Sequence, residues 1–216
     1  MSQEISKGGL PTAIMARLHA PVYASRLREL VRLIIPRLKQ ADQILDVGCG
    51  SGALGRTILD DPCCPLDVKV LGLERARRRD CLIEVGVYDG GIIPYTDRSY
   101  DVVILADVLH HAADPDQIFS ECVRVSRRLL VIKDHQLKGF LAYARVSLID
   151  WAANTPYGVP CLYRYYTPAQ WEESNRRHGL RVLEEFTSMS LYPYIYNLLF
   201  GGSLQYMVIA EVPEIG

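Results

Sequence analysis

The stretch QILDVGCGSGALG, residues 43–55, decides how the rest of the chain is interpreted. Its first half is an apolar run that carries a single acid, Asp46, near its end. Three glycines then follow at alternate positions: Gly48, Gly50 and Gly52. This order predicts a buried strand, a tight turn and the start of a helix, because so direct a passage from strand to helix requires backbone angles that glycine adopts readily. Glycine also lets a nucleotide-like ligand lie against the backbone.

Part of this stretch, residues 50–55, also fits the G-x-G-x-x-G pattern of dinucleotide-binding turns. Asp46 favours S-adenosylmethionine instead, because a carboxylate just before the glycines would repel a pyrophosphate but could pair with the ammonium group of a methionine moiety. Glu74 ends the next predicted strand, where an acid can accept hydrogen bonds from the ribose hydroxyls of either ligand. The preference for S-adenosylmethionine therefore depends on Asp46.

Length and composition favour one domain with a cap. The chain has 216 residues and 49% hydrophobic content, enough for one good core. We expect an N-terminal helical cap (1–40), a cofactor-binding core (41–135), a substrate-side cap (136–168), and a C-terminal helix with edge strands (169–216). The net charge of −1, from 24 basic and 25 acidic residues, gives no electrostatic footprint for nucleic acid, so none is expected as a partner.

The six cysteines show no C-x-x-C spacing, so reduced thiols are expected, and neither a zinc site nor a disulfide framework is. No apolar run reaches about 18 residues, and the N-terminal segment lacks a basic region followed by an apolar stretch. We therefore expect a cytoplasmic protein that does not insert into a membrane. The oligomeric state is left open.

Apolar runs alternate with helical patterns along the chain. This alternation predicts crossover units and a mostly parallel sheet. The fold class is α/β, with a Rossmann-like, seven-stranded, mainly parallel sheet, helices on both faces and an antiparallel edge pair. Strands are predicted at 43–47, 68–73, 81–88, 100–106, 129–132, 181–187 and 204–212. Helices are predicted at 22–38, 53–59, 114–125, 140–154 and 167–179, with Asp114 and Thr167 as N-caps.

Three blocks together carry a family resemblance: DVGCGSG (46–52), Glu74, and IIPYTDRSYDVVILADVLHH (92–111). They resemble class I S-adenosylmethionine-dependent methyltransferases of the small-molecule type, over roughly residues 40–135. The resemblance implies an enzyme that transfers a methyl group to oxygen, nitrogen or activated carbon of a small molecule, such as a specialised metabolite or a quinone-like compound. In place of the family's usual Pro-Gly-Gly turn before the fifth strand the chain has residues 126–128, Ser-Arg-Arg, which shortens the turn.

Ligands of open parallel sheets bind at the carboxyl ends of the strands. The residues expected to bind the cofactor lie in the glycine turn or at these ends: Asp46, Gly48, Cys49, Gly50, Gly52, Glu74, Asp89 and Ala106. The resemblance implies that Asp89 meets the exocyclic amine of adenine. A turn-forming aspartate before two glycines is the alternative.

The candidate catalytic residues are His111, His135 and Asp107, all at strand ends. Histidine can accept a proton near working pH, although holding the acceptor in line with the sulfonium should supply most of the rate. Of the adjacent His110 and His111, one is expected to pack inward and to hydrogen-bond backbone, and His111 is preferred as the base. Asp134 is expected to act independently of the His135 side chain. No metal is expected.

Residues 155–166 are rich in aromatic side chains and suit a planar or partly apolar acceptor. Alternatively, Tyr163, Tyr165 and Tyr166 only cover the sheet edge. Two other functions stay open: an NAD-binding oxidoreductase, and a non-catalytic methyltransferase-like partner subunit, since fold alone does not guarantee activity.

Overall fold

The computed structural model describes residues 10–154, 161–192, 197 and 201–213. The predicted aromatic connection therefore lies in part, at residues 155–160, outside the described residues. The helices are α1 (Leu10–Ile34), the 3-10 helix η1 (Ile35–Arg37), α2 (Ala53–Asp60), η2 (Leu109–His111), α3 (Pro115–Val125), α4 (Ala142–Asn154) and α5 (Pro168–Arg177). The strands are β1 (Gln43–Val47), β2 (Lys69–Glu74), β3 (Val85–Val87), β4 (Tyr100–Ala106), β5 (Ser126–His135), β6 (Arg181–Phe186) and β7 (Gln205–Glu211).

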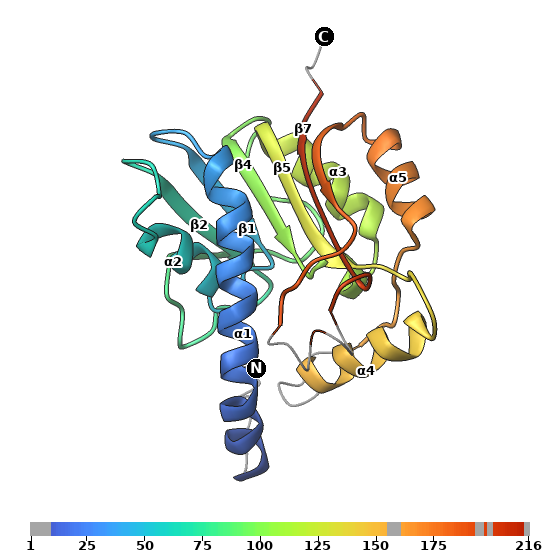
Figure 1. The fold of residues 1–216 in the computed structure, drawn as a ribbon. Helices are drawn as coiled ribbons and strands as arrows, with labels where there is room; N and C mark the ends of the chain where they lie inside the picture. Colours follow the sequence, from blue (N-terminus) through green and yellow to red (C-terminus); the bar gives the residue numbers. More distant parts are fainter. Residues whose placement is uncertain (1–9, 155–160, 193–196, 198–200, 214–216) are drawn as a thin grey trace.

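The strands form one seven-stranded sheet in the order β3-β2-β1-β4-β5-β7-β6 (Figure 1). Strands β1 to β5 pair in parallel, whereas β7 pairs antiparallel with both β5 and β6. This topology confirms the predicted fold class, including the antiparallel edge pair. The parallel strands all end at the same edge of the sheet, where ligands bind in open α/β folds.

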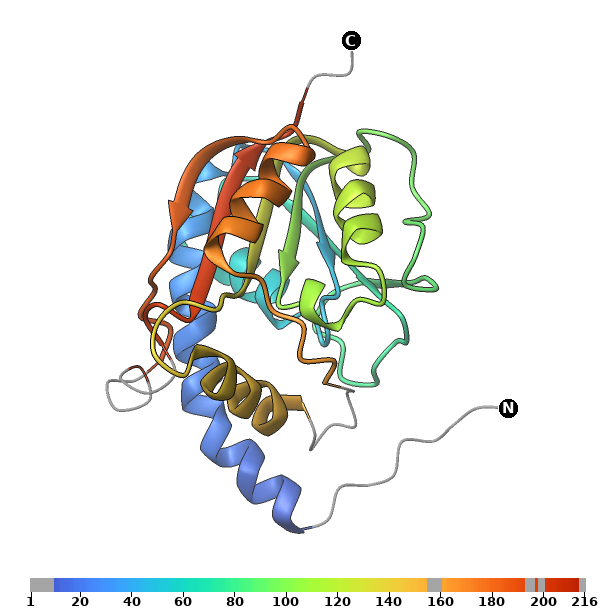
Figure 2. The same ribbon diagram turned by 90° about the vertical axis from the view of Figure 1, so that its right-hand side faces the viewer.

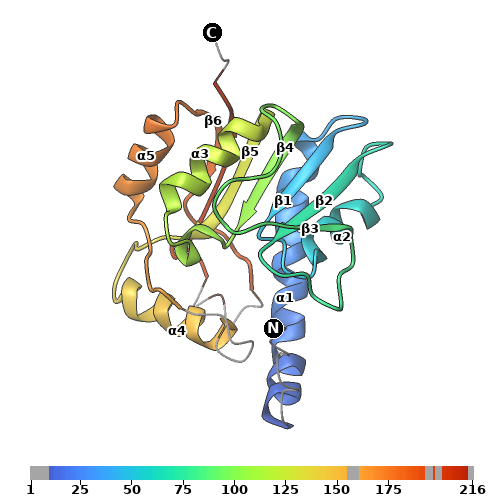
Figure 3. The ribbon, with the colours of Figure 1, turned by 180° about the vertical axis from the view of Figure 1, so that it is seen from behind.

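Helices cover both faces of the sheet. One core packs Leu30 and Ile34 of α1 and Ile58 of α2 against Ile44 and other residues of one face. The opposite core packs α3 and α5 against the alternate residues, such as Leu45. Successive strand residues point to opposite faces, which is why neighbouring apolar residues of one strand serve different cores. Figure 3 shows α3 and α5 on the face opposite to α1.

Two segments lie beyond the carboxyl ends of the parallel strands. The N-terminal half of α1 projects past the sheet, and α4 lies across the same end (Figure 2). A small cluster that includes Val146, Tyr165 and Leu204 holds α4 in place. Among the described residues, no helix combines the length and apolar character that crossing a bilayer requires. All six cysteines are free thiols.

Both predicted N-caps are confirmed. The side chain of Asp114 accepts a hydrogen bond from the backbone N–H of Gln117 at 3.0 Å. At the start of α5, the Thr167 hydroxyl accepts from the backbone N–H of Gln170, and the Gln170 side chain accepts from that of Thr167, a reciprocal capping box.

Two strands and one helix differ from the predictions. β3 is shorter than residues 81–88, because it is an edge strand that pairs only with the last part of β2. β5 starts earlier than predicted: Ser126 already pairs with Tyr100, so residues 126–128 belong to an irregular strand start and not to a turn. The predicted helix at 22–38 joins the segment before it in α1 and stops at Ile34, ahead of a 3-10 turn that contains Pro36.

Candidate functional site

The glycine turn and the end of β2 are tied together by Glu74. Its Oε1 accepts a hydrogen bond from the backbone N–H of Gly50 at 2.9 Å, and its Oε2 accepts from that of Arg75 at 2.9 Å. Gly48 N–H donates to the Leu73 carbonyl oxygen at 2.8 Å, which brings the turn to the same place. The carboxylate is therefore fixed beside the turn, with oxygen lone pairs left for the ribose hydroxyls of a nucleoside.

Asp46 lies on β1 just before this turn and is only 2% exposed. Burial raises the pKa of its carboxyl to about 7; Arg26 opposes the shift and Glu74 adds to it. Its Oδ2 has no hydrogen-bond partner among the described residues. Because an unpaired buried carboxylate oxygen is costly, the position fits a cationic group brought by a ligand, such as the ammonium of S-adenosylmethionine.

Asp107 is held by two cations. Arg26 Nη2 and Lys133 Nζ each lie 2.5 Å from one of its oxygens. Burial by itself would raise the pKa of Asp107, but Lys133 and Arg26 hold it well below its usual range. The carboxylate therefore stays ionised and is unsuited to proton transfer, so its predicted catalytic role stays a prediction. What it does in the structure is tie α1 to the end of β4.

The adjacent histidines point to different partners. His110 packs inward, as expected for one of the pair, but its Nδ1 bonds the Asp134 carboxylate at 2.6 Å and not a backbone group. His111 keeps 20% of its side chain exposed, and its Nε2 lies 3.7 Å from Oδ1 of the buried Asp150. The Tyr165 hydroxyl donates to Oδ2 of Asp150 at 2.6 Å. The structure thus leaves His111 as the more accessible imidazole.

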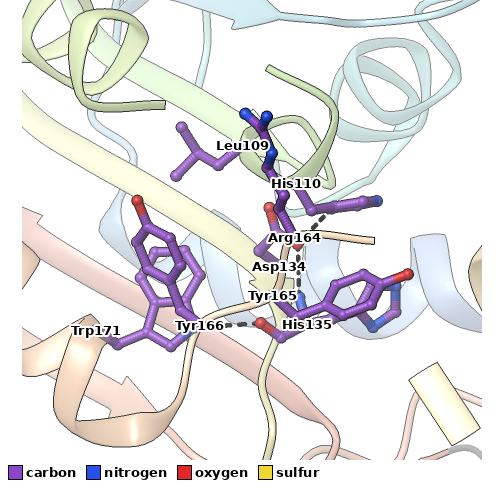
Figure 4. Close-up of a pocket in the computed structure, with 8 residues that line it drawn as sticks. All are labelled: Leu109, His110, Asp134, His135, Arg164, Tyr165, Tyr166 and Trp171. Carbon is purple, nitrogen blue, oxygen red and sulfur yellow. Dashed lines mark hydrogen bonds and ion pairs between the residues drawn. The ribbon is translucent and has the colours of Figure 1, made fainter. Parts of the chain in front are cut away.

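His135 lies deeper than the catalytic prediction requires. Burial, followed by the charge of Lys133, lowers the pKa of its imidazole to about 3, so it stays neutral and is a weak base. Its carbonyl oxygen accepts a hydrogen bond from Trp171 Nε1 at 3.2 Å. His135 and Asp134 border a cavity of about 10 Å³, room for one water molecule (Figure 4). Its role as a base stays a prediction, while Asp134 does act independently of it by orienting His110.

The remaining predicted cofactor residues frame the same edge. Gly52 N–H bonds the Cys49 carbonyl oxygen at 2.8 Å within the turn, and Ala106 ends β4. Asp89 is exposed, and its Oδ1 accepts from the backbone N–H of Gly91 at 2.8 Å, the turn-forming arrangement. One oxygen remains for a ligand, so the adenine contact stays a prediction.

Sequence reasoning missed Arg26, Asp150 and the pairing of Tyr165 with it. Arg26 carried only the signal of a basic residue in an amphipathic helix, and Asp150 lies in a helix without any motif. Both acquire partners from distant segments of the chain: Asp107 for Arg26, and the two histidines for Asp150. An acid in the otherwise apolar run of residues 148–152 was the one available hint in the sequence.

The fold and the geometry of the site fit a nucleoside cofactor at the carboxyl ends of a parallel sheet. A family model described as "Methyltransferase domain" matches residues 45–129, the segment from the glycine turn to the start of the fifth strand. Residues 45–129 therefore match a methyltransferase domain, and the match supports a class I enzyme that uses S-adenosylmethionine as its methyl donor. It confirms the predicted resemblance to this family and the predicted cofactor.

The chain is similar to two curated methyltransferases. It is 21% identical over 190 residues to the ubiquinone biosynthesis O-methyltransferase of Sinorhizobium fredii, covering 79% of this chain and 73% of the relative. It is 30% identical over 112 residues to the 27-O-demethylrifamycin SV methyltransferase of Amycolatopsis mediterranei, covering 48% of this chain and 41% of the relative.

A solved structure shares the fold across the whole chain. The 1,6-didemethyltoxoflavin-N1-methyltransferase of Burkholderia thailandensis, bound to 1,6-didemethyltoxoflavin and S-adenosylhomocysteine, superposes with a TM-score of 0.63. The match covers 99% of this chain and 94% of that chain, at 11% sequence identity.

Replacing Arg26 with methionine should lower the free energy of unfolding by about 1–3 kcal/mol, because the partly buried Asp107 loses one of its two cations. Chemical denaturation at neutral pH measures the change. Arg28→Met is the matched control, since Arg28 lies two residues along α1 and is exposed. Equal losses in both variants would show that the contact between Arg26 and Asp107 does not stabilise the cap.

Proposed function

We propose that the enzyme methylates a small, partly apolar molecule, at an oxygen in preference to nitrogen or carbon. The observation that carries the proposal is the shared edge of the sheet: the cofactor carboxylates Asp46 and Glu74 end neighbouring strands, and the partly exposed His111 follows the next one. An acceptor beside His111 would therefore meet the methyl group of the cofactor.

The surface of the substrate-side cap supports an apolar acceptor. Large apolar side chains of α4 and the residues before it stay exposed, with Phe140 at 84% exposure and Leu148 and Trp151 at 51% each. Leu148 and Trp151 are three residues apart and share one side of the helix. An exposed apolar surface next to a binding site is typical of a ligand entrance.

The comparisons support oxygen as the accepting atom. Two of the three proteins described above carry the accepting oxygen in their names, and the third is named as an N1-methyltransferase. All three names point to small molecules. The acceptor of this chain is inferred from that shared class, and an aromatic or conjugated hydroxyl compound fits both the names and the apolar cap.

The experiment is incubation of the protein with methyl-labelled S-adenosylmethionine and a panel of phenolic and quinol compounds, followed by mass spectrometry. We expect label in one class of phenol or quinol as an O-methyl ether. Label recovered only in protein or nucleic acid would contradict the proposal.

The variant Glu74→Ala tests whether this carboxylate binds the cofactor. It should weaken S-adenosylhomocysteine about 10- to 100-fold in calorimetry, because the ribose hydroxyls lose a charged acceptor. Glu84→Ala, which removes an exposed glutamate just before β3, should leave the affinity unchanged. Unchanged affinity in Glu74→Ala would remove the ribose assignment.

A further inference from the structure

Three ligand-type side chains converge where α4 covers the strand ends. They are His110 and His111 of η2 and Asp150 of α4, and one donor atom from each lies within 4.8 Å of the others. Asp150 and His110 are buried, whereas His111 is partly exposed on the substrate side. The set, two imidazoles and one carboxylate, is typical of protein sites for divalent first-row transition metals.

The separations suit a shared ion better than direct hydrogen bonds. Oδ1 of Asp150 lies 3.8 Å from Nε2 of His110 and 3.7 Å from Nε2 of His111. Both distances exceed the hydrogen-bond range of about 2.7–3.2 Å. Two ligand atoms at about 2.1 Å from one tetrahedral zinc ion lie about 3.4 Å apart, close to the observed values.

The orientation of His110 suits a cation between it and Asp150. A carboxylate can only accept, so the contact between Nδ1 and Asp134 means that Nδ1 carries the hydrogen and donates it. The other nitrogen, Nε2, then presents its lone pair toward the Asp150 carboxylate unless a proton or a metal ion lies there. Metal-binding histidines commonly donate their second nitrogen to a carboxylate in this way.

Hydrogen bonds from two neighbouring side chains fix the orientation of Asp150, as Asp134 does for His110. The Tyr165 hydroxyl holds its Oδ2 at 2.6 Å, and the Asn154 amide donates to its Oδ1 at 2.7 Å. The Asp134 carboxylate lies against the imidazole of His110 and the Asp150 carboxylate against both imidazoles, so a divalent cation between the ligands would be next to two acidic groups. Fixed orientation and adjacent acidic groups are what a preformed metal site needs.

We propose that His110, His111 and Asp150 bind a divalent transition metal ion of the zinc class, with an open coordination position on the side of His111. Three protein ligands and an open position are the arrangement of catalytic metal sites, whereas structural zinc sites use four protein ligands. That the open position takes an oxygen of the methyl acceptor depends on the proposed function; binding of the ion does not. A His111 that holds a metal ion is not the general base expected above.

The experiment is metal analysis of the full chain, purified without chelators and loaded with Zn²⁺, together with visible spectroscopy of the Co²⁺ form. We expect about one equivalent of zinc and the intense absorption of low-coordinate cobalt. His111→Asn should lower zinc affinity at least about 100-fold, and Tyr165→Phe about 10-fold, since it removes only an outer contact. His178→Asn, at a histidine that stacks on Phe119, should retain the metal.

Each result decides the proposal. Less than about a tenth of an equivalent in the wild-type chain, or unchanged zinc affinity in a folded His111→Asn variant, would overturn the metal site. Calorimetry with S-adenosylhomocysteine verifies that each variant is folded, and Asp150→Asn is interpreted only if it passes that check. A chain that binds zinc but methylates no phenol or quinol would overturn the proposed function and leave the metal site standing.

Discussion

Replacing Asp46 with asparagine should stabilise the cofactor-free enzyme at about pH 8 and, at the same time, remove most of its affinity for S-adenosylmethionine. The carboxyl is buried and its pKa is raised to about 7 from an ordinary value of 3.8. Such a shift corresponds to about 4 kcal/mol of lost stability once the group is ionised in both states. An amide of the same shape recovers part of this, about 1–3 kcal/mol, because it is still a buried polar group.

The pH dependence has a definite sign. Between about pH 4 and pH 7 the folded chain holds a proton on Asp46 that the unfolded chain has already lost, so this group's contribution to stability falls as pH rises. Above about pH 7 the loss is complete and stays constant. The stability advantage of Asp46→Asn should therefore grow across that window and then level off, which denaturation curves at several pH values can follow.

Cofactor binding should change in the opposite direction. Asparagine has no negative charge to pair with the ammonium group. Loss of one hydrogen bond to a charged group costs about 1.5–3 kcal/mol, or about 10- to 100-fold in affinity. Asp42→Asn is the contrasting variant. Asp42 is also buried and lies next to β1, but it accepts hydrogen bonds from Lys39 N–H and from Arg128, so its loss should destabilise the fold without affecting binding. If both variants destabilised the fold equally, the Asp46 carboxylate would not be an unpaired buried charge that is kept for the cofactor.

The glycine turn and the two helix caps could be predicted because each signal lies within a few residues of its structural consequence. Asp114 caps a helix that begins one residue later, and the glycines directly follow the strand they terminate. The mainly parallel sheet with its antiparallel edge pair could be predicted from the same local patterns, since alternating strands and helices indicate crossover connections. The extent of β3 and β5 could not be predicted in this way, because strand length depends on which neighbours pair on each side.

The partners of the site residues could not be predicted either. Asp107 and His111 were identified from their place after β4, but Arg26 and Asp150 reach them from helices that are remote in the chain. Asp150 changes the chemistry most, because it turns a pair of histidines into a possible ligand set, against the sequence-based expectation of no metal. Such contacts depend on how α1 and α4 cover the strand ends, and no local pattern encodes that packing.

Gly48→Ala should mainly lower the stability of the fold, whereas Gly50→Ala should mainly weaken cofactor binding, although the two residues lie in the same turn. Both glycines have positive φ angles, 70° and 61°, which cost an alanine about 1–2 kcal/mol. A Cβ at Gly48 would also lie 2.4 Å from Cγ2 of Val108, whereas a Cβ at Gly50 would meet nothing closer than Arg78 Nη1 at 3.8 Å. We expect Gly48→Ala to lower the free energy of unfolding by about 2–4 kcal/mol and Gly50→Ala by about 1–2 kcal/mol.

Binding should rank the two variants the other way. The open space beside Gly50, next to the Glu74 carboxylate, is where the nucleoside is expected to lie against the backbone, so a methyl group there should weaken S-adenosylhomocysteine at least about 100-fold in calorimetry. Adding Val108→Ala tests the origin of the Gly48 defect: it should recover the steric part of the lost stability and leave the backbone strain. If Gly50→Ala bound the cofactor normally, the nucleoside would have to lie elsewhere; if Val108→Ala gave no recovery, the tight contact with Val108 would not be what requires glycine at position 48.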